Sequence, residues 1–212
     1  MKLILFGGAE SGQAEREVRM IVQIINEIKP RQVLHIPFAR ITTNEAEWTG
    51  DWFGRYARLA GGIEYLNAAR RGDIAKVKRP LVFISGGSQN FNLLKKLKAS
   101  PRLRRLISEA SVVIGESAGA MVLGAYLRSK GGPGGSALVK GLGIIKDTII
   151  EPHYTQRARQ ALLVQEMAET GARYGLGIDA MVAAEFMSGG FPRRIKKIGR
   201  GRVELKINRG RL

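Results

Sequence analysis

One serine, two histidines and several arginines are the side chains in this sequence whose setting could support covalent chemistry. Ser117 lies in VVIGESAGAMVLG, residues 112–124, between two apolar runs. The pattern Gly-Glu-Ser-Ala-Gly matches the nucleophile elbow G-x-S-x-G, in which small neighbours let a strand turn sharply into a helix and expose the serine hydroxyl. The backbone N–H of Ala118 would then be placed to stabilise a developing oxyanion. A glycine-rich turn without catalysis, or one that binds phosphate, would show the same pattern.

A serine becomes a good nucleophile only when a base takes its proton, and histidine is the usual base. His35 alternates with apolar residues inside a short predicted strand, so we expect it to have a structural role. His153 lies in IIEPHYTQRAR, after an apolar strand and before a helix. Ser117 and His153 are thus both expected at carboxyl ends of strands, where open α/β sheets bind ligands. Gly86-Gly87, after another apolar strand, could complete an oxyanion hole or form an ordinary turn.

Two arginines follow the candidate base closely. Arg157 and Arg159 lie four and six residues after His153, so the first turn of a helix could direct Arg157 back toward the same edge of the sheet. A guanidinium group is suited to clamp a carboxylate, which predicts an acidic substrate. The alternative is that both arginines only solvate the helix surface.

The elements that must position these side chains follow from alternating apolar and amphipathic runs. Helices and strands alternate, which predicts a three-layer α/β fold: a mostly parallel sheet with helices on both faces, an antiparallel hairpin at the C-terminal edge, and a single domain over 1–212. Strands are expected at 2–6, 32–38, 62–68, 80–87 and 111–117, with further short strands in hairpins beyond residue 175. Helices are expected at 13–29, 89–98, 101–110, 118–127 and 156–170, and around Trp48, Trp52, Phe53 and Tyr56. A flexible loop is expected at 129–138.

Composition restricts the classes of protein that remain. The 212 residues include 35 Lys or Arg and 18 Asp or Glu, a formal net charge of +17, and no cysteine. Disulfides, thiolate metal sites and a cysteine nucleophile are therefore excluded. The basic residues are dispersed, which favours a solvated surface over a nucleic-acid interface, although such a charge would attract anions. No signal peptide or membrane span is apparent, so we expect a cytoplasmic protein.

The motifs together resemble those of the peptidase E and cyanophycinase family of serine peptidases, whose fold is like that of class I glutamine amidotransferases. The resemblance rests on FISGGSQNFNLLKKL, VVIGESAGAMVLG, HYTQRAR and GLGIDAMVAAEF, in that order along the chain. It implies Ser117 as nucleophile, His153 as base and oxyanion N–H groups from Gly87 and Ala118. It also implies a substrate pocket at or near Gln89, Arg157 and Arg159. The reaction it implies is cleavage of short peptides or polymers at aspartyl residues, without metal or cofactor. A homodimer is a further possibility that the resemblance implies.

The third member of a triad is where the sequence departs from this family. A carboxylate normally holds the imidazole tautomer and stabilises its positive charge. The resemblance implies a glutamate at the position occupied here by Ala180. The adjacent Asp179 is our candidate for the acid, provided that the backbone there is a loop or bulge, since neighbouring side chains along a strand point to opposite faces. The other carboxylates considered are Asp147, Glu151 and Glu185. Glu116 is unusual beside a nucleophile, because it would repel an anionic substrate unless paired, for example with an arginine.

Three functional hypotheses follow from these observations. The first is a serine dipeptidase that acts on aspartyl or isoaspartyl peptides, with full or weakened activity. The second is an esterase of the α/β-hydrolase type, with its acid between the serine and the histidine in the sequence, as Asp147 or Glu151 would be. The third is a basic module that binds nucleic acid or another anion through its net charge, with no recognisable reading surface.

Overall fold

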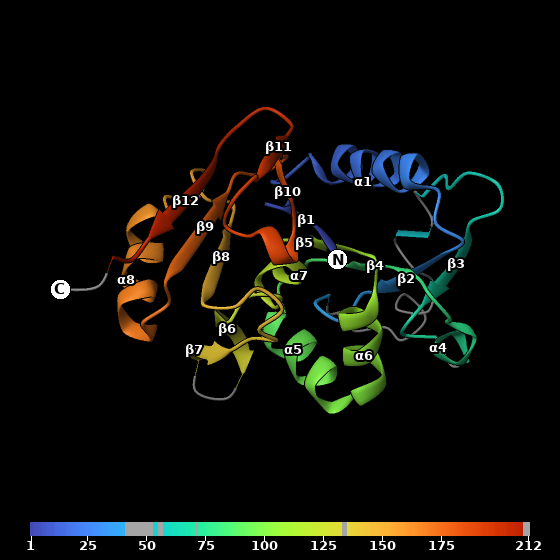
Figure 1. The fold of residues 1–212 in the computed structure, drawn as a ribbon, viewed down its shortest axis with the longest axis horizontal. Coiled ribbons are helices and arrows are strands. Elements are labelled where there is room, and N and C mark those ends of the chain that lie inside the picture. Colours follow the sequence, from blue (N-terminus) through green and yellow to red (C-terminus); the bar gives the residue numbers. More distant parts are fainter. Residues whose placement is uncertain (41–52, 55–56, 71, 133–134, 210–212) are drawn as a thin grey trace.

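A seven-stranded sheet forms the centre of the computed structural model, which describes residues 1–212 except 41–52, 55–56, 71, 133–134 and 210–212 (Figure 1). The strand order is β11-β10-β1-β5-β4-β2-β3. The strands β1, β5, β4, β2 and β3 are parallel, whereas β10 pairs antiparallel with β1 and β11 antiparallel with β10. Their bounds are β1 (Lys2–Phe6), β2 (Gln32–Ile36), β3 (Glu64–Asn67), β4 (Leu81–Ile84), β5 (Val112–Glu116), β10 (Ala183–Met187) and β11 (Lys196–Ile198).

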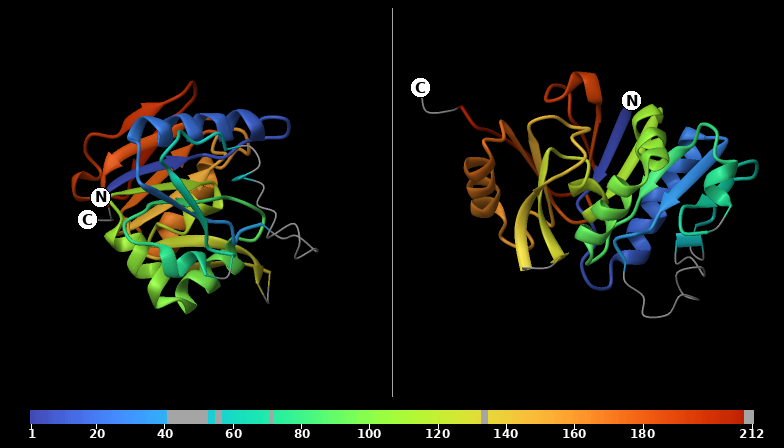
Figure 2. Two further views of the ribbon diagram at one scale, coloured as in Figure 1. Left: turned by 90° about the vertical axis from the view of Figure 1, so that its right-hand side faces the viewer. Right: turned by 90° about the horizontal axis from the view of Figure 1, so that it is seen from below.

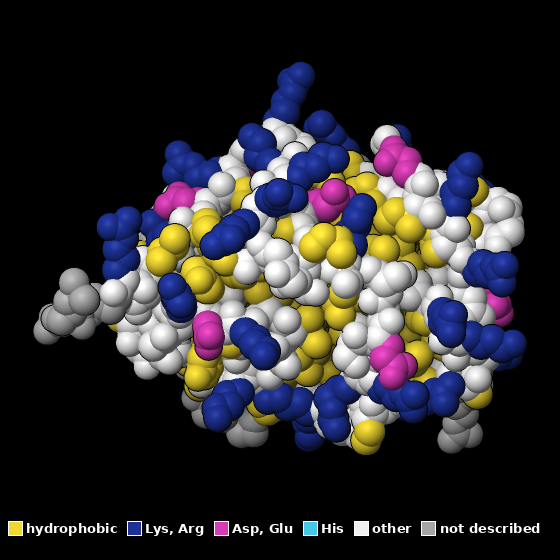
Figure 3. Space-filling view, in the orientation of Figure 1, with side chains coloured by type: hydrophobic (Ala, Val, Ile, Leu, Met, Phe, Trp, Pro, Cys, Tyr) yellow, Lys and Arg dark blue, Asp and Glu magenta, His cyan; other side chains and the backbone are white. Residues whose placement is uncertain are grey.

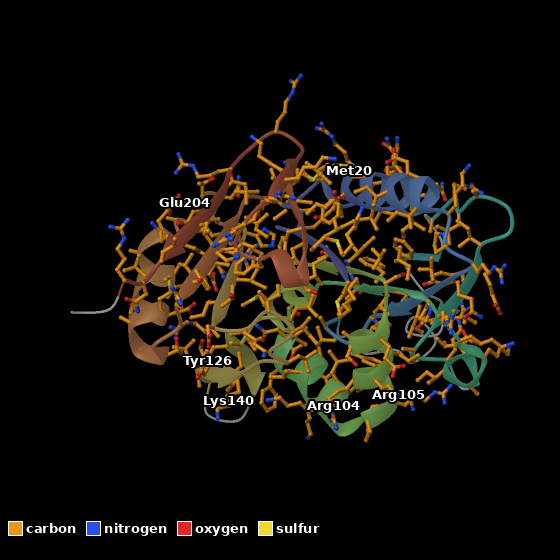
Figure 4. The ribbon with its side chains drawn as sticks, in the orientation of Figure 1. Met20, Arg104, Arg105, Tyr126, Lys140 and Glu204 are labelled. Atoms are coloured by element: carbon orange, nitrogen blue, oxygen red, sulfur yellow. The ribbon has the colours of Figure 1, made fainter. Side chains whose placement is uncertain are left out.

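A second sheet of five strands, in the order β12-β9-β8-β6-β7, lies beside the first (Figure 2). Its strands are β6 (Tyr126–Gly132), β7 (Gly135–Lys140), β8 (Thr148–Pro152), β9 (Tyr174–Ile178) and β12 (Val203–Ile207). The strands β6, β8 and β9 are parallel; β7 and β12 are antiparallel additions at the two edges. Tyr126 and Lys140, which stand opposite each other in the β6–β7 register, lie side by side in Figure 4.

Helices cover both faces of the larger sheet because its strands alternate their side chains between two hydrophobic clusters. Leu3 and Leu5 of β1 belong to the cluster under α5 (Asn90–Ala99) and α6 (Pro101–Glu109), while Ile4 and Phe6 belong to the cluster under α1 (Ala14–Ile28). Figure 1 shows α1 on one side of the sheet and α5 and α6 on the other. The outer side of the second sheet packs against α8 (Gln160–Thr170) through Ile149, Tyr154, Leu163 and Met167. Further helices in the described part of the chain are the short α4 (Asp73–Lys76), α7 (Ala118–Met121) and η1 (Ser188–Gly190).

The predicted α/β class, with helices on both faces and an antiparallel C-terminal edge, is confirmed. The second sheet was not predicted, and it changes three local expectations. The helix expected at 118–127 ends at Met121, because the following chain packs against β8, where the Ala125 N–H donates to the Thr148 carbonyl oxygen (2.8 Å). The flexible loop expected at 129–138 instead contributes to the β6–β7 hairpin. The last two strands do not pair with each other: β11 joins the larger sheet and β12 the second.

Two further expectations concern helices. The helix expected at 156–170 begins only at Gln160, after a series of turns. Most of the helix expected around Trp48 and Trp52 lies outside the described residues. The space-filling view shows Lys and Arg spread over the visible face rather than gathered over one element (Figure 3). Arg104 and Arg105 of α6, for example, lie at the outer border in Figure 4. In the described part of the chain, no helix is long and apolar enough to cross a membrane.

The turn from β5 into α7 requires glycine because the backbone passes directly over β4. A Cβ atom at Gly119 would lie 2.0 Å from the carbonyl oxygen of Ile84, and one at Gly115 would lie 2.9 Å from the Cα atom of Ala120. Neither contact can be relieved by rotating a side chain, since the neighbouring atoms belong to the backbone. The two glycines of the G-x-S-x-G pattern therefore fix the path of the chain on either side of Ser117.

We therefore expect Gly119→Ala to reduce the free energy of unfolding by about 2 kcal/mol or more, the usual range for overpacking a tight interior. The matched control is Gly189→Ala, because a Cβ atom there meets nothing within 4 Å. The control should stay within about 0.5 kcal/mol of the parent protein. Chemical denaturation with a common m-value would measure both variants, and equal stability of the two would contradict the packing argument.

Candidate active site

Ser117 occupies a strained backbone position between β5 and α7. Its φ and ψ angles are 50° and −110°, a sparsely populated combination for a residue with a side chain. Such a conformation costs on the order of 1–3 kcal/mol and persists only where surrounding contacts impose it. The Ser117 N–H donates to the carbonyl oxygen of Phe6 (3.0 Å), and the Ser117 carbonyl accepts from Ala120 and Met121. These bonds hold the serine at the carboxyl end of the larger sheet, as its sequence pattern predicted.

His153 reaches Ser117 from the second sheet. It follows β8 directly, has a φ angle of 51°, and its N–H donates to the Gly7 carbonyl oxygen (2.9 Å). The His153 Nε2 atom lies 3.2 Å from the Ser117 Oγ atom, and its ring is buried. The predicted convergence of these two side chains is therefore present in the structure.

The carboxylate that contacts His153 is Glu10, which sequence reasoning missed. The Glu10 Oε1 atom lies 2.6 Å from the Nδ1 atom of His153. An ionised carboxylate can only accept, so Nδ1 carries the proton and Nε2 is free to accept from the serine hydroxyl. Glu10 comes from the loop between β1 and α1, 143 positions from His153. The backbone of the same loop also approaches His153 closely at Gly7 and Gly8, and this glycine pair is the one feature of the sequence that could have indicated the loop.

Asp179 does not take the position expected for it. Its Oδ1 atom accepts from the N–H and the hydroxyl of Thr155 (3.0 and 2.8 Å), and its Oδ2 atom accepts from the Arg202 N–H (2.8 Å). These bonds use the carboxylate to join three segments next to β8, β9 and β12 in the second sheet. The expectation that Asp179 orients His153 is corrected to Glu10.

The other carboxylates considered from the sequence also have roles elsewhere. Glu151 pairs with Arg159 (2.6 Å), and Glu185 pairs with Lys2 across two strands (3.8 Å). Asp147 lies in the turn before β8, at the opposite end of that strand from His153. Among the described residues, Glu10 is the one carboxylate hydrogen-bonded to His153.

Arg157 holds Glu10 in place and affects both titratable neighbours. Its Nε atom donates to Glu10 Oε1 (3.1 Å) and one terminal nitrogen donates to Oε2 (3.4 Å). Partial burial opposes ionisation of Glu10, but the hydrogen bonds from Arg157 and His153 outweigh it and lower the pKa of Glu10 below its usual value. Burial and then the charge of Arg157 lower the pKa of His153 below 6.5, against the opposing effect of Glu10. His153 is therefore largely neutral at pH 7, as a general base must be.

Glycines form the wall of the site around the reacting atoms. Gly8 has a φ angle of 88°, and a Cβ atom there would lie 2.6 Å from His153 Nε2 and 3.0 Å from the Cβ atom of Ser117. A Cβ atom at Gly87 would lie 2.3 Å from the Ala39 carbonyl oxygen. Gly87 and Ala118, the two predicted oxyanion donors, line the same cleft as Ser117.

This cleft has a volume of about 360 Å³ and a mixed polar and apolar lining. Both predicted arginines, Arg157 and Arg159, line it, whereas Asn90 takes the place expected for Gln89. The Gln89 N–H instead donates to the Ala39 carbonyl oxygen (2.8 Å), just before α5 begins. The full lining is Gly87, Ser88, Asn90, Ser117, Ala118, Met121, Arg128, Pro152, His153, Arg157, Ala158, Arg159 and Leu162.

Two of the arginines in the cleft are anchored by buried acids. Arg159 pairs with Glu151 and Arg128 with Glu166, each at 2.6 Å, and both carboxyl groups are fully buried. Burial and the charge of Glu166 raise the pKa of Glu151 to about 7, against the effect of Arg159. The cleft therefore presents cationic groups in fixed positions. One of its lining residues, Arg128, was not indicated by any sequence motif.

The remaining sequence expectation concerns His35, whose structural role is confirmed. It is fully buried in β2, its Nδ1 and Nε2 atoms contact the hydroxyls of Tyr65 (2.7 Å) and Ser85 (2.9 Å), and its ring stacks on Phe83. Among the described residues, no three His, Asp or Glu side chains gather in a way that could hold a metal ion.

Comparisons with known proteins agree with this geometry. The sequence model of peptidase family S51 matches residues 3–191. The cyanophycinase of Geminocystis herdmanii is 34% identical over 133 residues, which are 58% of this chain and 48% of that protein. The cyanophycinase of a Nostoc species is 29% identical over 174 residues, which are 72% of this chain and 57% of that protein. The chain thus spans about half the length of these two relatives.

A solved structure shows the same fold. A protein from Listeria monocytogenes EGD-e assigned as a peptidase E superposes with a TM-score of 0.58 at 18% identity, over 94% of this chain and 98% of that one. The resemblance inferred from the sequence motifs is therefore confirmed. Since the family match extends over nearly all of the sequence, from the first strand to the segment after β10, the chain belongs to peptidase family S51.

Proposed function

We propose that this protein is a serine peptidase that hydrolyses short peptides at aspartyl residues. The observation that carries the proposal is the hydrogen-bonded series Ser117–His153–Glu10, with contacts of 3.2 and 2.6 Å. A base within reach of the nucleophile, itself oriented by a third group, is the arrangement that activates a serine. Membership of peptidase family S51 supports the same reaction class.

The geometry supports a two-step reaction through an acyl-enzyme. The Ser117 oxygen attacks the scissile carbonyl carbon while His153 Nε2 takes its proton, and Glu10 stabilises the imidazolium through Nδ1. The N–H groups of Gly87 and Ala118 stabilise the oxyanion. The carbon–nitrogen bond then breaks as His153 returns the proton to the leaving amine. Water attacks the acyl-enzyme with His153 again as base, which releases the acid and restores Ser117.

The cationic lining favours an acidic substrate. Arg157 uses Nε and one terminal nitrogen for Glu10, and a guanidinium group has five N–H donors, so donors remain for a substrate carboxylate. Arg159 and Arg128 are held in the same cleft by buried acids. Charge-assisted bonds to such groups are among the stronger polar interactions in proteins.

Cyanophycin is the second candidate substrate, because several relatives of this chain are named cyanophycinases. The esterase alternative has less support. In α/β-hydrolases the acid follows the serine in the sequence, whereas here Glu10 precedes both Ser117 and His153. On the face shown in Figure 3 the Lys and Arg side chains are dispersed, which gives the nucleic-acid alternative less support.

The substrate proposal predicts hydrolysis of Asp-Leu with kcat/KM at least about tenfold above that of Asn-Leu, since one charge-assisted bond is worth about 1.5–3 kcal/mol. Ser117→Ala should abolish both turnover and labelling by a fluorophosphonate probe. Release of free leucine measures the reaction, with isoaspartyl-Leu and cyanophycin assayed in parallel. Equal rates for the two dipeptides, or cleavage of cyanophycin alone, would overturn the aspartyl dipeptide assignment.

Because Glu10 contacts His153 Nδ1, we expect Glu10→Gln to lower kcat by about 10²–10⁴. The amide no longer stabilises the His153 imidazolium and can hold the imidazole in the wrong tautomer. Asp179→Asn is the matched comparison, since it also removes one carboxylate charge. It should lower the melting temperature, because Asp179 joins three segments, while kcat stays within about threefold of the parent. A large loss in Asp179→Asn with an active Glu10→Gln would restore Asp179 as the acid.

The lowered pKa of His153 predicts the pH dependence of the reaction. Activity requires the neutral imidazole, so kcat/KM rises with pH and reaches half its plateau below pH 6.5. Arg157→Gln removes a cation that lowers this pKa, so the rising limb should move to higher pH. Arg105→Gln is the charge-matched control, because Arg105 lies on the outer side of α6 and pairs with Glu109. This electrostatic account would be contradicted if the rising limb of the kcat/KM profile stays in place, or moves to lower pH, in Arg157→Gln.

A further inference from the structure

A group of three charged side chains lies directly behind the nucleophile and has no part in the proposed proton transfers. Glu116 ends β5 beside Ser117, Glu17 lies in the first turns of α1, and Arg40 follows β2. Both carboxyl groups are buried, and the charge of Arg40 acts on each of them. The three side chains come from three different strand–helix units, so they join elements that are far apart in the sequence.

Glu116 holds the loop that contains the predicted oxyanion donor. Its Oε2 atom accepts from the Gly86 N–H at 2.6 Å, a short bond that is buried. A Cβ atom at Gly86 would lie 2.6 Å from Glu116 Oε1 and 2.8 Å from the Cβ atom of Ser117. The loop backbone is thus closely fitted against both the carboxylate and the nucleophile.

The other side of this loop rests on the segment that carries Arg40. Gly87 packs against the Ala39 carbonyl, and the Gln89 N–H donates to the same carbonyl oxygen at 2.8 Å. Residues 86–89 are therefore held between the Glu116 carboxylate and the backbone next to Arg40, while Gly87 itself lines the cleft. An oxyanion donor must be fixed before the reaction, because its advantage comes from needing no reorganisation as charge develops.

The charge state of the group is compatible with this role. Burial and the nearby charge of Glu116 raise the pKa of Glu17 to about 9, against the effects of Arg40 and of a hydrogen bond from the Gly8 backbone. Burial also raises the pKa of Glu116, but the charge of Arg40 and the hydrogen bond from the Gly86 N–H favour its ionised form. With Glu17 protonated, the group then has one negative charge, on Glu116, opposite the one positive charge of Arg40. A neutral buried group avoids the desolvation cost of an unpaired ion.

We propose that Glu116 is a positioning residue for the oxyanion hole: it holds the Gly86 N–H so that the following N–H, of Gly87, faces the carbonyl under attack. This inference rests on the proposed peptidase function. It explains why an acid can stand beside a nucleophile that acts on acidic substrates: its carboxylate bonds the Gly86 N–H, is not part of the cleft lining, and is compensated by the charge of Arg40. Glu116 touches no substrate atom, so its effect must be transmitted through the loop.

Two variants of Glu116 separate this role from a general effect on folding. Glu116→Gln keeps an oxygen that can accept from the Gly86 N–H, whereas Glu116→Met has a similar size and no such acceptor. We expect Glu116→Met to lower kcat by about 10²-fold, as for loss of an oxyanion donor, with KM changed less than about threefold. Glu116→Gln should recover kcat to within about tenfold of the parent.

The matched control is Asn67→Leu. The buried Asn67 side chain accepts from the Ala69 N–H (2.8 Å) in the turn after β3, so the variant removes a comparable bond outside the site. It should lower the melting temperature and leave the kcat of the folded protein unchanged. Glu116→Met with a normal kcat, or Glu116→Gln as impaired as Glu116→Met at equal melting temperature, would overturn the proposal.

Amide hydrogen exchange tests the inference independently of activity. Exchange in residues 86–89 should be at least about tenfold faster in Glu116→Met than in the parent, and near the parent rate in Glu116→Gln and Asn67→Leu. If the parent protein hydrolyses none of the peptides, this exchange pattern would still support the positioning role while the proposed function fails. Unchanged exchange in Glu116→Met would overturn the positioning role itself.

Discussion

The imidazole of His153 is the point on which the rest of the site depends. It contacts Ser117 through one ring nitrogen and Glu10 through the other, and its own N–H donates to Gly7. These partners come from the turn after β5 and from the loop after β1, both in the larger sheet, whereas His153 follows β8 in the second. Small residues are required wherever these segments meet, because a Cβ atom at Gly8 would displace the ring. The glycine content around the site follows from this crowding.

Charge compensation is the second constraint. The protein is strongly basic, yet the arginines of the cleft each face a carboxylate: Arg157 faces Glu10, Arg159 faces Glu151, and Arg128 faces Glu166. An arginine fixed by an acid loses less conformational entropy when it binds a substrate than a free one does. The net charge attracts anions from a distance, whereas these pairs determine where an anion can be bound.

The sequence predicted the parts of the site that follow strands directly. Ser117 and His153 each come at the end of an apolar run, which predicts a position at the carboxyl end of a sheet. The sequence suggested one sheet, whereas in the structure the carboxyl ends of two sheets bring these side chains together. Glu10 could not be predicted in this way, because its place depends on the path of a loop that is 143 positions away from His153. Asp179 was misassigned for a related reason: it lies in the short link between β9 and β10, in a segment that the sequence predicted to be a short strand. Those strands belong to different sheets, and the second sheet arises from pairings that no local pattern records.

The division of Ser117 and His153 between two sheets has a consequence for how the protein loses activity. Relative displacement of the sheets by about an ångström would break a 3.2 Å contact, and it would also disturb the larger hydrophobic cluster, to which Leu5 of β1 and Leu176 of β9 both belong. This shared cluster opposes such a displacement, whereas the bonds of Asp179 to Thr155 and Arg202 join segments next to β8, β9 and β12 within the second sheet. Inactivation by heat or denaturant would therefore accompany the loss of this shared packing, and a catalytic assay would follow the same transition as circular dichroism.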